Sequence, residues 1–359
     1  MGINKLLTYL TKNHGDVFTE VHLSNYRGKK ISIDTSIYMN KFKAINSDRW
    51  LESFVSMVCM LRAENIHPVF VFDNGNPTEK EAEKKKRSDQ RAKQRSKIET
   101  LAKSVANYEK TKEVDDILRE VYEKETGQKE RRRSLLLRSY PSFDLSVVRD
   151  KLGRMQKNLF VIKPADYEKL KALLGIMKVP WILAADEAEK TCVQLVQTGL
   201  AHAVLSEDSD CLAYGVNIFA HKLDFCKKTV LEVNRSTLLA ILDMTQNMFT
   251  DFCIMCGTDY NPNIKGVGVV NSYSLIAAHK TIDQLPDNID VTPLKHKIVR
   301  RLFTDFPPLP PSKKEKIVWC GKPDRTDMRV FLFKHNMRHL EEQIVQACCE
   351  STQKIVFTP

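Results

Sequence analysis

Short apolar runs alternate with longer amphipathic stretches along much of the chain. Three runs, KKISID, HPVFVFD and AHAVLSEDSD, are rich in Val, Ile and Phe, and each ends in carboxylates. Each run predicts a buried strand of about 4 to 6 residues. Between them, residues 48–65 and 166–177 repeat apolar positions at helical spacing. Strands that alternate with helices predict an α/β fold with a mostly parallel central sheet.

The three apolar runs end in four aspartates, which are Asp34, Asp73, Asp208 and Asp210. Ligands of open α/β sheets bind beyond the carboxyl ends of the strands, so these aspartates are expected at one edge. Glu187 and Glu189 follow Asp186, which we expect to cap a helix whose first turn holds both glutamates. Taken singly, such residues are usually turn formers or partners of a helix dipole. Together they would repel one another without cations, which favours a metal site.

An oxygen-rich site of this kind suits phosphodiester cleavage. Two hard cations about 3.5 to 4 Å apart activate water and stabilise the leaving oxygen. Mg²⁺ prefers oxygen ligands, so a shallow bowl of carboxylates with few His or Cys residues is the expected donor set.

Residues 78–126 contain neither Gly nor Pro and are dominated by Lys, Arg, Glu, Ala and Gln, which predicts one or two long polar helices. Basic residues at spacings of three or four share one helical face there, namely Lys80, Lys84, Arg87, Arg91 and Arg95. A solvated charged face is the common meaning of such a run. Because this one starts seven residues after Asp73, contact with phosphate is favoured. A second basic cluster, residues 131–133, could grip DNA or serve in nuclear import.

Composition narrows the class of protein. The 359 residues, 42% of them hydrophobic, are enough for a sizeable core, and the net charge of +11 favours a polyanionic partner. No run approaches the roughly 18 apolar residues that span a membrane, so we expect a soluble intracellular protein without membrane contact. Nine cysteines in apolar segments indicate buried reduced thiols, and Cys253 and Cys256 are expected in the core rather than on zinc.

Two glycines, Gly266 and Gly268, stand before a predicted helix in the second half of the chain. Glycines at this place let the backbone N–H groups of a helix approach a phosphate closely, although a lone Gly-x-Gly is weak evidence. The stretch FPPLPPSKKEK is typical of a linker, and a final helix is expected around NMRHLEEQIVQACC.

Six blocks, MGI, IDTSIY, VFVFDNGNP, AADEAEK, LSEDSDCLAYG and CGTDYNPNIKGVG, occur in the order found in flap endonucleases and their XPG-type relatives. From Met1 to at least Ile276 the chain resembles that family. The resemblance implies a PIN-like nuclease core, a helical arch and a helix–two-turn–helix DNA-binding element. The implied division is core at 1–87 and 166–260, arch at 88–165, helix–two-turn–helix at 261–305 and C-terminal extension at 306–359.

The resemblance also implies roles for particular residues. Two Mg²⁺ ions per subunit are implied, and Mn²⁺ could replace them. One ion would be held by four carboxylates, those of Asp34, Asp73, Glu187 and Glu189. The other would be held by three, those of Asp208, Asp210 and Asp259. Lys80 and Arg87 would be the catalytic cations that steady the scissile phosphate. Further DNA contacts would come from Lys84, Arg91, Arg95, Gly257, Gly266 and Gly268, with a potassium ion at the helix–two-turn–helix element.

Some positions depart from the family pattern. Val269, Val270 and Asn271 stand where the family has Pro, Lys and Arg. Tyr38 lies four residues after Asp34, as in the XPG branch, and either stacks on a base or packs in the core. The ending STQKIVFTP lacks a sliding-clamp motif, so clamp binding by that route is not expected.

The implied function is a Mg²⁺-dependent endonuclease that cuts 5′ flaps and branched DNA in replication, repair or recombination. We expect a monomer in the nucleus, or in the host nucleus if the protein is viral. The alternatives are a Holliday-junction resolvase or 5′ exonuclease of the same family, an RNA-directed relative, and a DNA-binding scaffold without catalysis.

Overall fold

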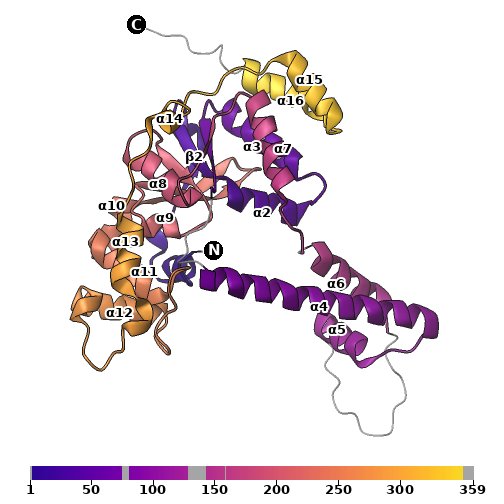
Figure 1. Ribbon diagram of the computed structural model, residues 1–359, viewed down its shortest axis with the longest axis horizontal. Helices are drawn as coiled ribbons and strands as arrows, with labels where there is room; N and C mark the ends of the chain where they lie inside the picture. Colours follow the sequence, from indigo (N-terminus) through magenta and orange to yellow (C-terminus); the bar gives the residue numbers. More distant parts are fainter. Residues whose placement is uncertain (1, 75–80, 128–142, 158, 351–359) are drawn as a thin grey trace. The chain divides into compact units, whose positions relative to one another are not determined.

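The computed structural model describes residues 2–74, 81–127, 143–157 and 159–350 (Figure 1). The chain divides into two compact units. We call the first the core unit, which comprises residues 1–42, 49–80 and 162–359. The second, the helical insertion, comprises residues 43–48 and 81–161.

Within its described residues, the core unit contains one seven-stranded sheet in the order β1-β7-β6-β5-β2-β3-β4. Its strands are β1 (Thr19–His22), β2 (Lys30–Asp34), β3 (His67–Phe72), β4 (Trp181–Leu183), β5 (Ala203–Leu205), β6 (Ile218–Asp224) and β7 (Thr229–Asn234). The strands from β6 to β4 run parallel to their neighbours, whereas β7 is antiparallel to both β6 and β1. The expected α/β fold with a mostly parallel sheet is confirmed.

The helices of the core unit form two layers, one on each face of the sheet. One layer contains α1 (Leu6–Asn13), α8 (Ala188–Gln197), α9 (Asp210–Ala213), α10 (Arg235–Leu242), α11 (Gln246–Cys256), α12 (Val269–His279) and α13 (His296–Thr304). The other contains α2 (Thr35–Ile45) up to Phe42, α3 (Trp50–Ala63), α7 (Pro164–Ile176), α15 (Arg325–Lys334) and α16 (Glu341–Val345). The short α14 (Pro311–Lys314) lies in the expected linker.

Strand β3 explains why the sheet is covered on both faces. Successive side chains of a strand point to opposite faces, and here both sets are apolar. Phe70 and Phe72 pack in the cluster that includes α3 and α7, whereas Val69 and Val71 pack in the cluster that includes α8 and α11. Figure 1 shows α8 on one side of β2 and α3 and α7 on the other. The carboxyl edge of the sheet is therefore held between two packed layers.

The helical insertion consists of α4 (Glu81–Thr111), α5 (Asp116–Thr126) and α6 (Leu145–Lys157). The two long polar helices expected from the sequence correspond to α4 and α5. Four residues form its small apolar core: Leu101, Val105, Leu118 and Val148. Outside this core, charged side chains pair across the helices, as Arg149 does with Glu109 and Lys151 with Glu125.

Several smaller expectations are also decided by the fold. Cys253 and Cys256 are buried free thiols in α11, as expected for core residues. Tyr38 is fully buried against Phe42, so its core role holds and base stacking is excluded. None of the described helices has the length and apolar character needed to cross a membrane. Residues 131–133 and the C-terminal residues 351–359, where no sliding-clamp motif is expected, lie outside the described residues.

Candidate active site

The strand-end aspartates come together at the carboxyl edge of the sheet. Asp34 is the last residue of β2, Asp73 follows β3, and Asp208 follows β5. These three strands are parallel neighbours in the order β5-β2-β3, so their carboxyl ends meet at one edge. Asp210 opens α9 just beyond this edge and its side chain is completely buried.

Asp34 lies at the centre of this group. Its side chain is 2% exposed, and burial followed by the charges of Asp73 and Asp208 raises its pKa well above the usual value. Hydrogen bonds offset part of this cost: Ser206 Oγ donates to Asp34 Oδ2 at 3.3 Å, and the Ser36 amide donates to Oδ1 at 3.1 Å. The fold therefore concentrates negative charge at a place where water solvates it poorly.

Glu187 and Glu189 come from the start of α8, although the cap is not the one that the sequence suggests. The expected N-cap, Asp186, is wrong: Glu187 is the N-cap residue and α8 begins at Ala188. Asp73 Oδ1 instead accepts the Ala188 amide at 2.8 Å, so a carboxylate from the neighbouring strand end satisfies the helix start. Asp73 Oδ2 also accepts from Ser36 Oγ. Asp73 is thus both a candidate metal ligand and the side chain that accepts the first amide of α8.

Glu187 is contacted by two buried tyrosines. The hydroxyls of Tyr260 and Tyr214 both lie within hydrogen-bonding distance of Glu187 Oε2, the latter at 3.1 Å, and the two hydroxyls are 2.8 Å apart. The pKa of Tyr214 is raised well above its usual value, mainly by burial and further by the neighbouring Tyr260 and Glu187, so this hydroxyl stays protonated. Asp259, the last candidate ligand, directly precedes Tyr260 and is partly buried.

The N-terminus of the chain also lies against the aspartates. Gly2 has a φ of +83°, and a Cβ built there would lie 2.1 Å from Asp208 Oδ1 and 2.9 Å from Asp210 Oδ1. The Ile3 amide donates to Ser209 Oγ at 2.9 Å. Only glycine is compatible with this approach. The sequence gives no periodic signal for Gly2, Tyr214 or Tyr260, although each lies in a block that carries the family resemblance.

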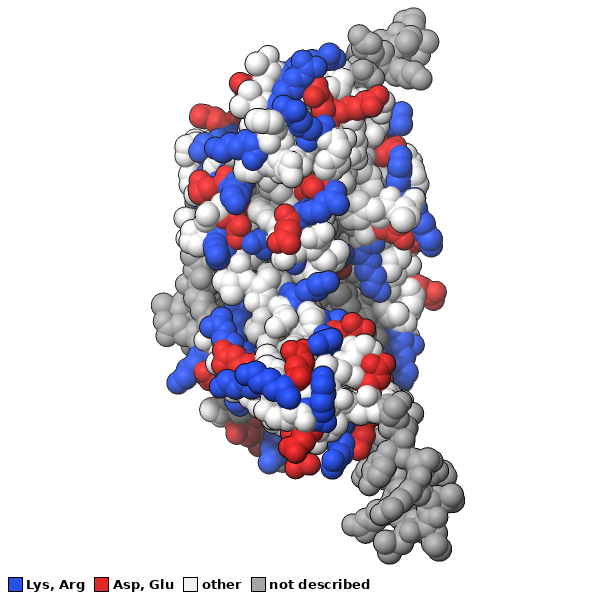
Figure 2. Space-filling model, turned by 90° about the vertical axis from the view of Figure 1, so that its right-hand side faces the viewer, with Lys and Arg blue, Asp and Glu red and all other residues white. Residues whose placement is uncertain are grey.

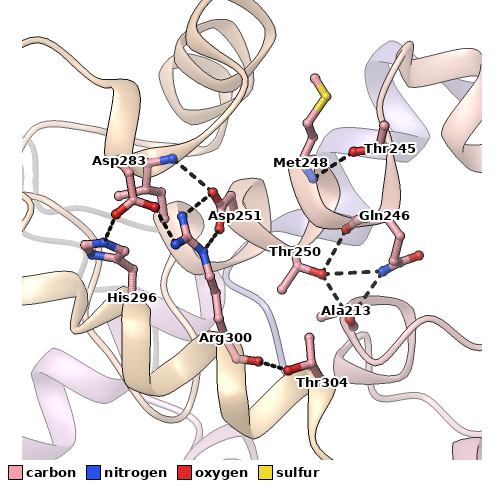
Figure 3. A network of polar contacts seen from close by, with 11 residues as sticks. Ala213, Thr245, Gln246, Met248, Thr250, Asp251, Asp283, His296, Arg300 and Thr304 are labelled. Atoms are coloured by element: carbon pink, nitrogen blue, oxygen red, sulfur yellow. Dashed lines mark hydrogen bonds and ion pairs between the residues drawn. The ribbon is translucent and has the colours of Figure 1, made fainter.

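A polar network fixes the helices that support this site (Figure 3). Arg300 of α13 donates from Nε and Nη2 to the two carboxylate oxygens of Asp251 on α11, at 2.6 Å each. Arg300 also pairs with Asp283, which in turn contacts His296. Thr250 of α11 donates to the Ala213 carbonyl at 3.3 Å, which ties α11 to the end of α9. The segments that carry Asp210 and Asp259 are therefore held together.

The candidate DNA-binding residues fall into two groups. On α4, Arg91 and Arg95 are exposed and Arg87 is partly exposed; Lys80 and the side chain of Lys84 lie outside the described residues. Basic and acidic side chains are interspersed on the face drawn in Figure 2, so the drawn surface has no purely basic stripe.

The glycine group lies at turns. Gly257 ends α11 with a φ of +90° and Gly266 has a φ of +83°. Gly268 is the N-cap of α12, without a side-chain capping hydrogen bond. A Cβ on Gly266 or Gly268 would meet no heavy atom within 4 Å, so the backbone before α12 is open to a ligand.

The donor set is compatible with a hard divalent cation. It consists of carboxylates and neighbouring hydroxyls, and the charges of Asp73 and Asp208 already disfavour ionised Asp34, which a cation would reverse. In the described part of the chain, however, no three His, Cys, Asp or Glu side chains are arranged so that they could hold a metal ion. Asp34, Asp73 and Asp208 are close enough for their charges to interact, but they do not form a coordination sphere.

Comparisons with known proteins identify relatives of this chain. The family models "XPG N-terminal domain" and "XPG I-region" match residues 1–94 and 178–259. The chain is 33% identical over 335 residues to a probable RAD2-like endonuclease, 369L, of Invertebrate iridescent virus 6, covering 85% of this chain and 80% of that protein. It is 30% identical over 320 residues to flap endonuclease 1 of Babesia bovis, covering 85% of this chain and 41% of the relative.

Solved structures share the fold. The catalytic core of Rad2 in complex with DNA substrate has a TM-score of 0.64 at 18% identity, covering 98% of this chain and all of that one. Human GEN1 in complex with Holliday junction DNA has a TM-score of 0.58 at 16% identity, covering 97% of this chain and 77% of that one. With the strand-end carboxylates, the two family models and the viral relative, the chain belongs to the XPG family of RAD2-like endonucleases.

Proposed function

We propose that this endonuclease cuts branched DNA at 5′ flaps by hydrolysis that depends on divalent metal ions. The observation that carries the proposal is the burial of Asp34 beside Asp73 and Asp208 at the carboxyl edge of the sheet. Like charges beside a buried carboxylate are unfavourable unless a cation offsets the repulsion, and bound divalent ions in a metal-dependent hydrolase would supply that charge. The flap endonuclease and RAD2-like relatives support the choice of DNA as substrate.

In the proposed site, one Mg²⁺ would be held by Asp34, Asp73, Glu187 and Glu189, and a second by Asp208, Asp210 and Asp259. When bound, the ions would supply hydroxide at neutral pH and neutralise charge on the leaving oxygen, and Mn²⁺ would substitute. Lys80 and Arg87 would steady the scissile phosphate by charge-assisted hydrogen bonds.

Other residues would bind the duplex at phosphates that do not react. The open backbone before α12, at Gly266 and Gly268, would present N–H groups to a phosphate, with a potassium ion nearby. Gly257 would lie against the duplex, while Lys84, Arg91 and Arg95 of α4 would contact the flap strand. These contacts are to phosphate, so they position the substrate without reading its sequence.

The test is cleavage of an end-labelled 5′-flap duplex with Mg²⁺, compared with linear duplex, a four-way junction and an RNA flap. We expect one product near the flap junction and none in EDTA. Asp208→Asn is the matched control, because it keeps the size of the side chain and removes its charge.

Other products would select other functions. Symmetric cuts in the four-way junction would identify a junction resolvase, and stepwise 5′ products an exonuclease, with the same metal site in either case. A folded protein that binds DNA and cuts none of these substrates would be a scaffold. For its place in the cell we propose the nucleus, the host nucleus if the gene is viral, which imaging of the tagged full chain would test.

A further inference from the structure

The two tyrosine hydroxyls on Glu187 have no part in the reaction outlined above. Both reach the same oxygen, Oε2. The three side chains are buried, with exposures of 6% for Glu187, 2% for Tyr214 and 9% for Tyr260. Two hydroxyl protons serve three close contacts, so a chain in which Tyr214 donates to Tyr260, and Tyr260 to Glu187, satisfies the group.

Tyr214, Tyr260 and Glu187, which we call the tyrosine cluster, come from segments that carry candidate ligands of both metal ions. Tyr214 is the C-cap of α9, the helix that Asp210 opens, and Tyr260 directly follows Asp259. Glu187 belongs to the proposed first ligand set, whereas Asp210 and Asp259 belong to the second. The cluster therefore joins the backbone segments of both sets through one carboxylate.

Aromatic packing holds the tyrosine rings in place. Phe303 of α13 contacts the rings of Tyr214 and Tyr260 edge to face, with centroids 5.0 and 5.6 Å apart. Helix α13 is itself anchored twice: Arg300 binds Asp251 as drawn in Figure 3, and Lys190 of α8 donates to the Leu302 carbonyl at 3.0 Å. The tyrosines cannot turn away from Glu187 unless this support moves.

We propose that Tyr214 and Tyr260 are positioning residues that fix the Glu187 carboxylate for a divalent cation and couple the two ligand sets. This inference rests on the proposed metal-dependent function. Partners that hydrogen-bond to a metal ligand orient it in advance, and their removal typically weakens metal binding about 10- to 100-fold. Since Tyr260 can accept from Tyr214 and donate to Glu187, its hydroxyl matters more, and the hydroxyl of Tyr214 acts largely through it.

The experiment measures Mn²⁺ binding to the full chain without DNA, by the loss of the free-ion EPR signal. The variants are Tyr214→Phe, Tyr260→Phe and the double variant, each of which keeps the ring that packs on Phe303. We expect about 10-fold weaker binding for Tyr260→Phe, a smaller effect for Tyr214→Phe, and a double variant close to Tyr260→Phe alone.

The chain offers a matched control for the loss of a hydroxyl. The Tyr26 hydroxyl also donates to a glutamate, Glu232 of β7, which is not a candidate ligand. Tyr26→Phe should leave Mn²⁺ affinity within about twofold while it changes stability as the site variants do.

Cleavage gives a second readout that a structural role would not move. The Mg²⁺ concentration for half-maximal cleavage should rise about 10-fold in Tyr260→Phe, while the rate at saturating Mg²⁺ recovers to within about threefold. A folded double variant with wild-type Mn²⁺ affinity and Mg²⁺ dependence would overturn the inference and leave the proposed function standing. A wild-type chain that binds no Mn²⁺ and cuts no DNA would overturn both.

Discussion

The core unit and the helical insertion both carry many carboxylates, but they place them in opposite surroundings. In the insertion, Glu109 and Glu120 are about half and two thirds exposed, and each pairs with a basic side chain nearby. In the core unit, Asp34 and Asp210 are 2% and 0% exposed at the carboxyl edge of the sheet. The exposed charges of the insertion have little effect on the free energy of folding, whereas the buried charges of the core unit destabilise the fold by desolvation. This difference is why we propose that the chemistry takes place in the core unit.

The largest effect should follow from neutralising one buried carboxylate. Asp208→Asn removes a charge that disfavours ionised Asp34 and keeps an oxygen that can accept the Asp210 amide. We expect flap cleavage to fall by about a thousandfold, the order of several kcal/mol of metal-assisted stabilisation. The free energy of unfolding in EDTA should not fall, because repulsion is relieved.

The insertion provides the counterpart of that change. Glu120→Gln neutralises an exposed carboxylate and should leave both cleavage and unfolding close to wild type. Initial rates and urea unfolding of the same preparations measure both quantities. If Asp208→Asn cut DNA at the wild-type rate, the buried carboxylates would not form the active site.

The second effect concerns ion pairs of unequal burial. Arg300 binds Asp251, whose side chain is 3% exposed, whereas Arg149 binds Glu109, whose side chain is 46% exposed. Arg300→Met should lower the free energy of unfolding by about 3 kcal/mol, because it leaves a buried charge without its partner. Arg149→Met should lower it by about 0–1 kcal/mol. Urea unfolding of both variants decides the comparison.

A double variant separates charge from packing. Adding Asp251→Asn to Arg300→Met removes the stranded charge and keeps an acceptor for the Ile282 amide, so part of the lost stability should return. A double variant less stable than Arg300→Met alone would mean that Asp251 acts chiefly by other contacts.

The same contrast applies to what the sequence could predict. The alternation of Val and Phe in β3 and the aspartates after the apolar runs are local patterns. The sheet and the carboxylates at its edge can therefore be predicted from the sequence. The start of α8 cannot be predicted in the same way. Local sequence favours Asp186 as its cap, but the Ala188 amide donates to Asp73, which is 115 positions earlier in the chain. Contacts set by tertiary packing leave no local pattern.

Tyr214 and Tyr260 illustrate that limit. Each lies in a short helical or turn segment, and a buried tyrosine there is equally consistent with ordinary core packing. Their contact with Glu187 depends on how α8, α9 and the turn after α11 meet. The candidate ligands could thus be proposed from the sequence, but the groups that orient them could not.

A third effect comes from adding one methyl group in each unit. Gly2→Ala places a Cβ where only 2.1 Å separates it from Asp208 Oδ1, at a φ of +83°. We expect cleavage to fall about tenfold and stability by about 1–3 kcal/mol, because the aspartate or the backbone must move. In the insertion, Gly153 lies within α6 with no heavy atom within 4 Å of an added Cβ. Gly153→Ala should therefore stabilise the chain by about 0.5–1 kcal/mol.

Initial rates and unfolding curves of these two variants test the opposite signs. Equal loss of activity in both would indicate a general effect of the substitution, and a Gly2→Ala enzyme with full activity would show that the N-terminus can leave the aspartates without consequence.

The smallest effect should come from Glu125, which pairs with Lys151 and Arg154 of α6. Lys151 lowers the pKa of Glu125 below its usual value, so the pair contributes fully above the unfolded pKa of about 4.3 and its contribution disappears as the pH falls further. Because the pair is at the surface, we expect Glu125→Gln to lower the melting temperature by about 2 °C or less at pH 7, with no difference from wild type at pH 3. Raising NaCl to about 1 M, where the screening length is near 3 Å, should remove the difference at pH 7 as well. Thermal unfolding across pH and salt measures this directly. A large, salt-resistant loss would show that the insertion depends on buried charge as the core unit does, and the contrast between the two units would fail.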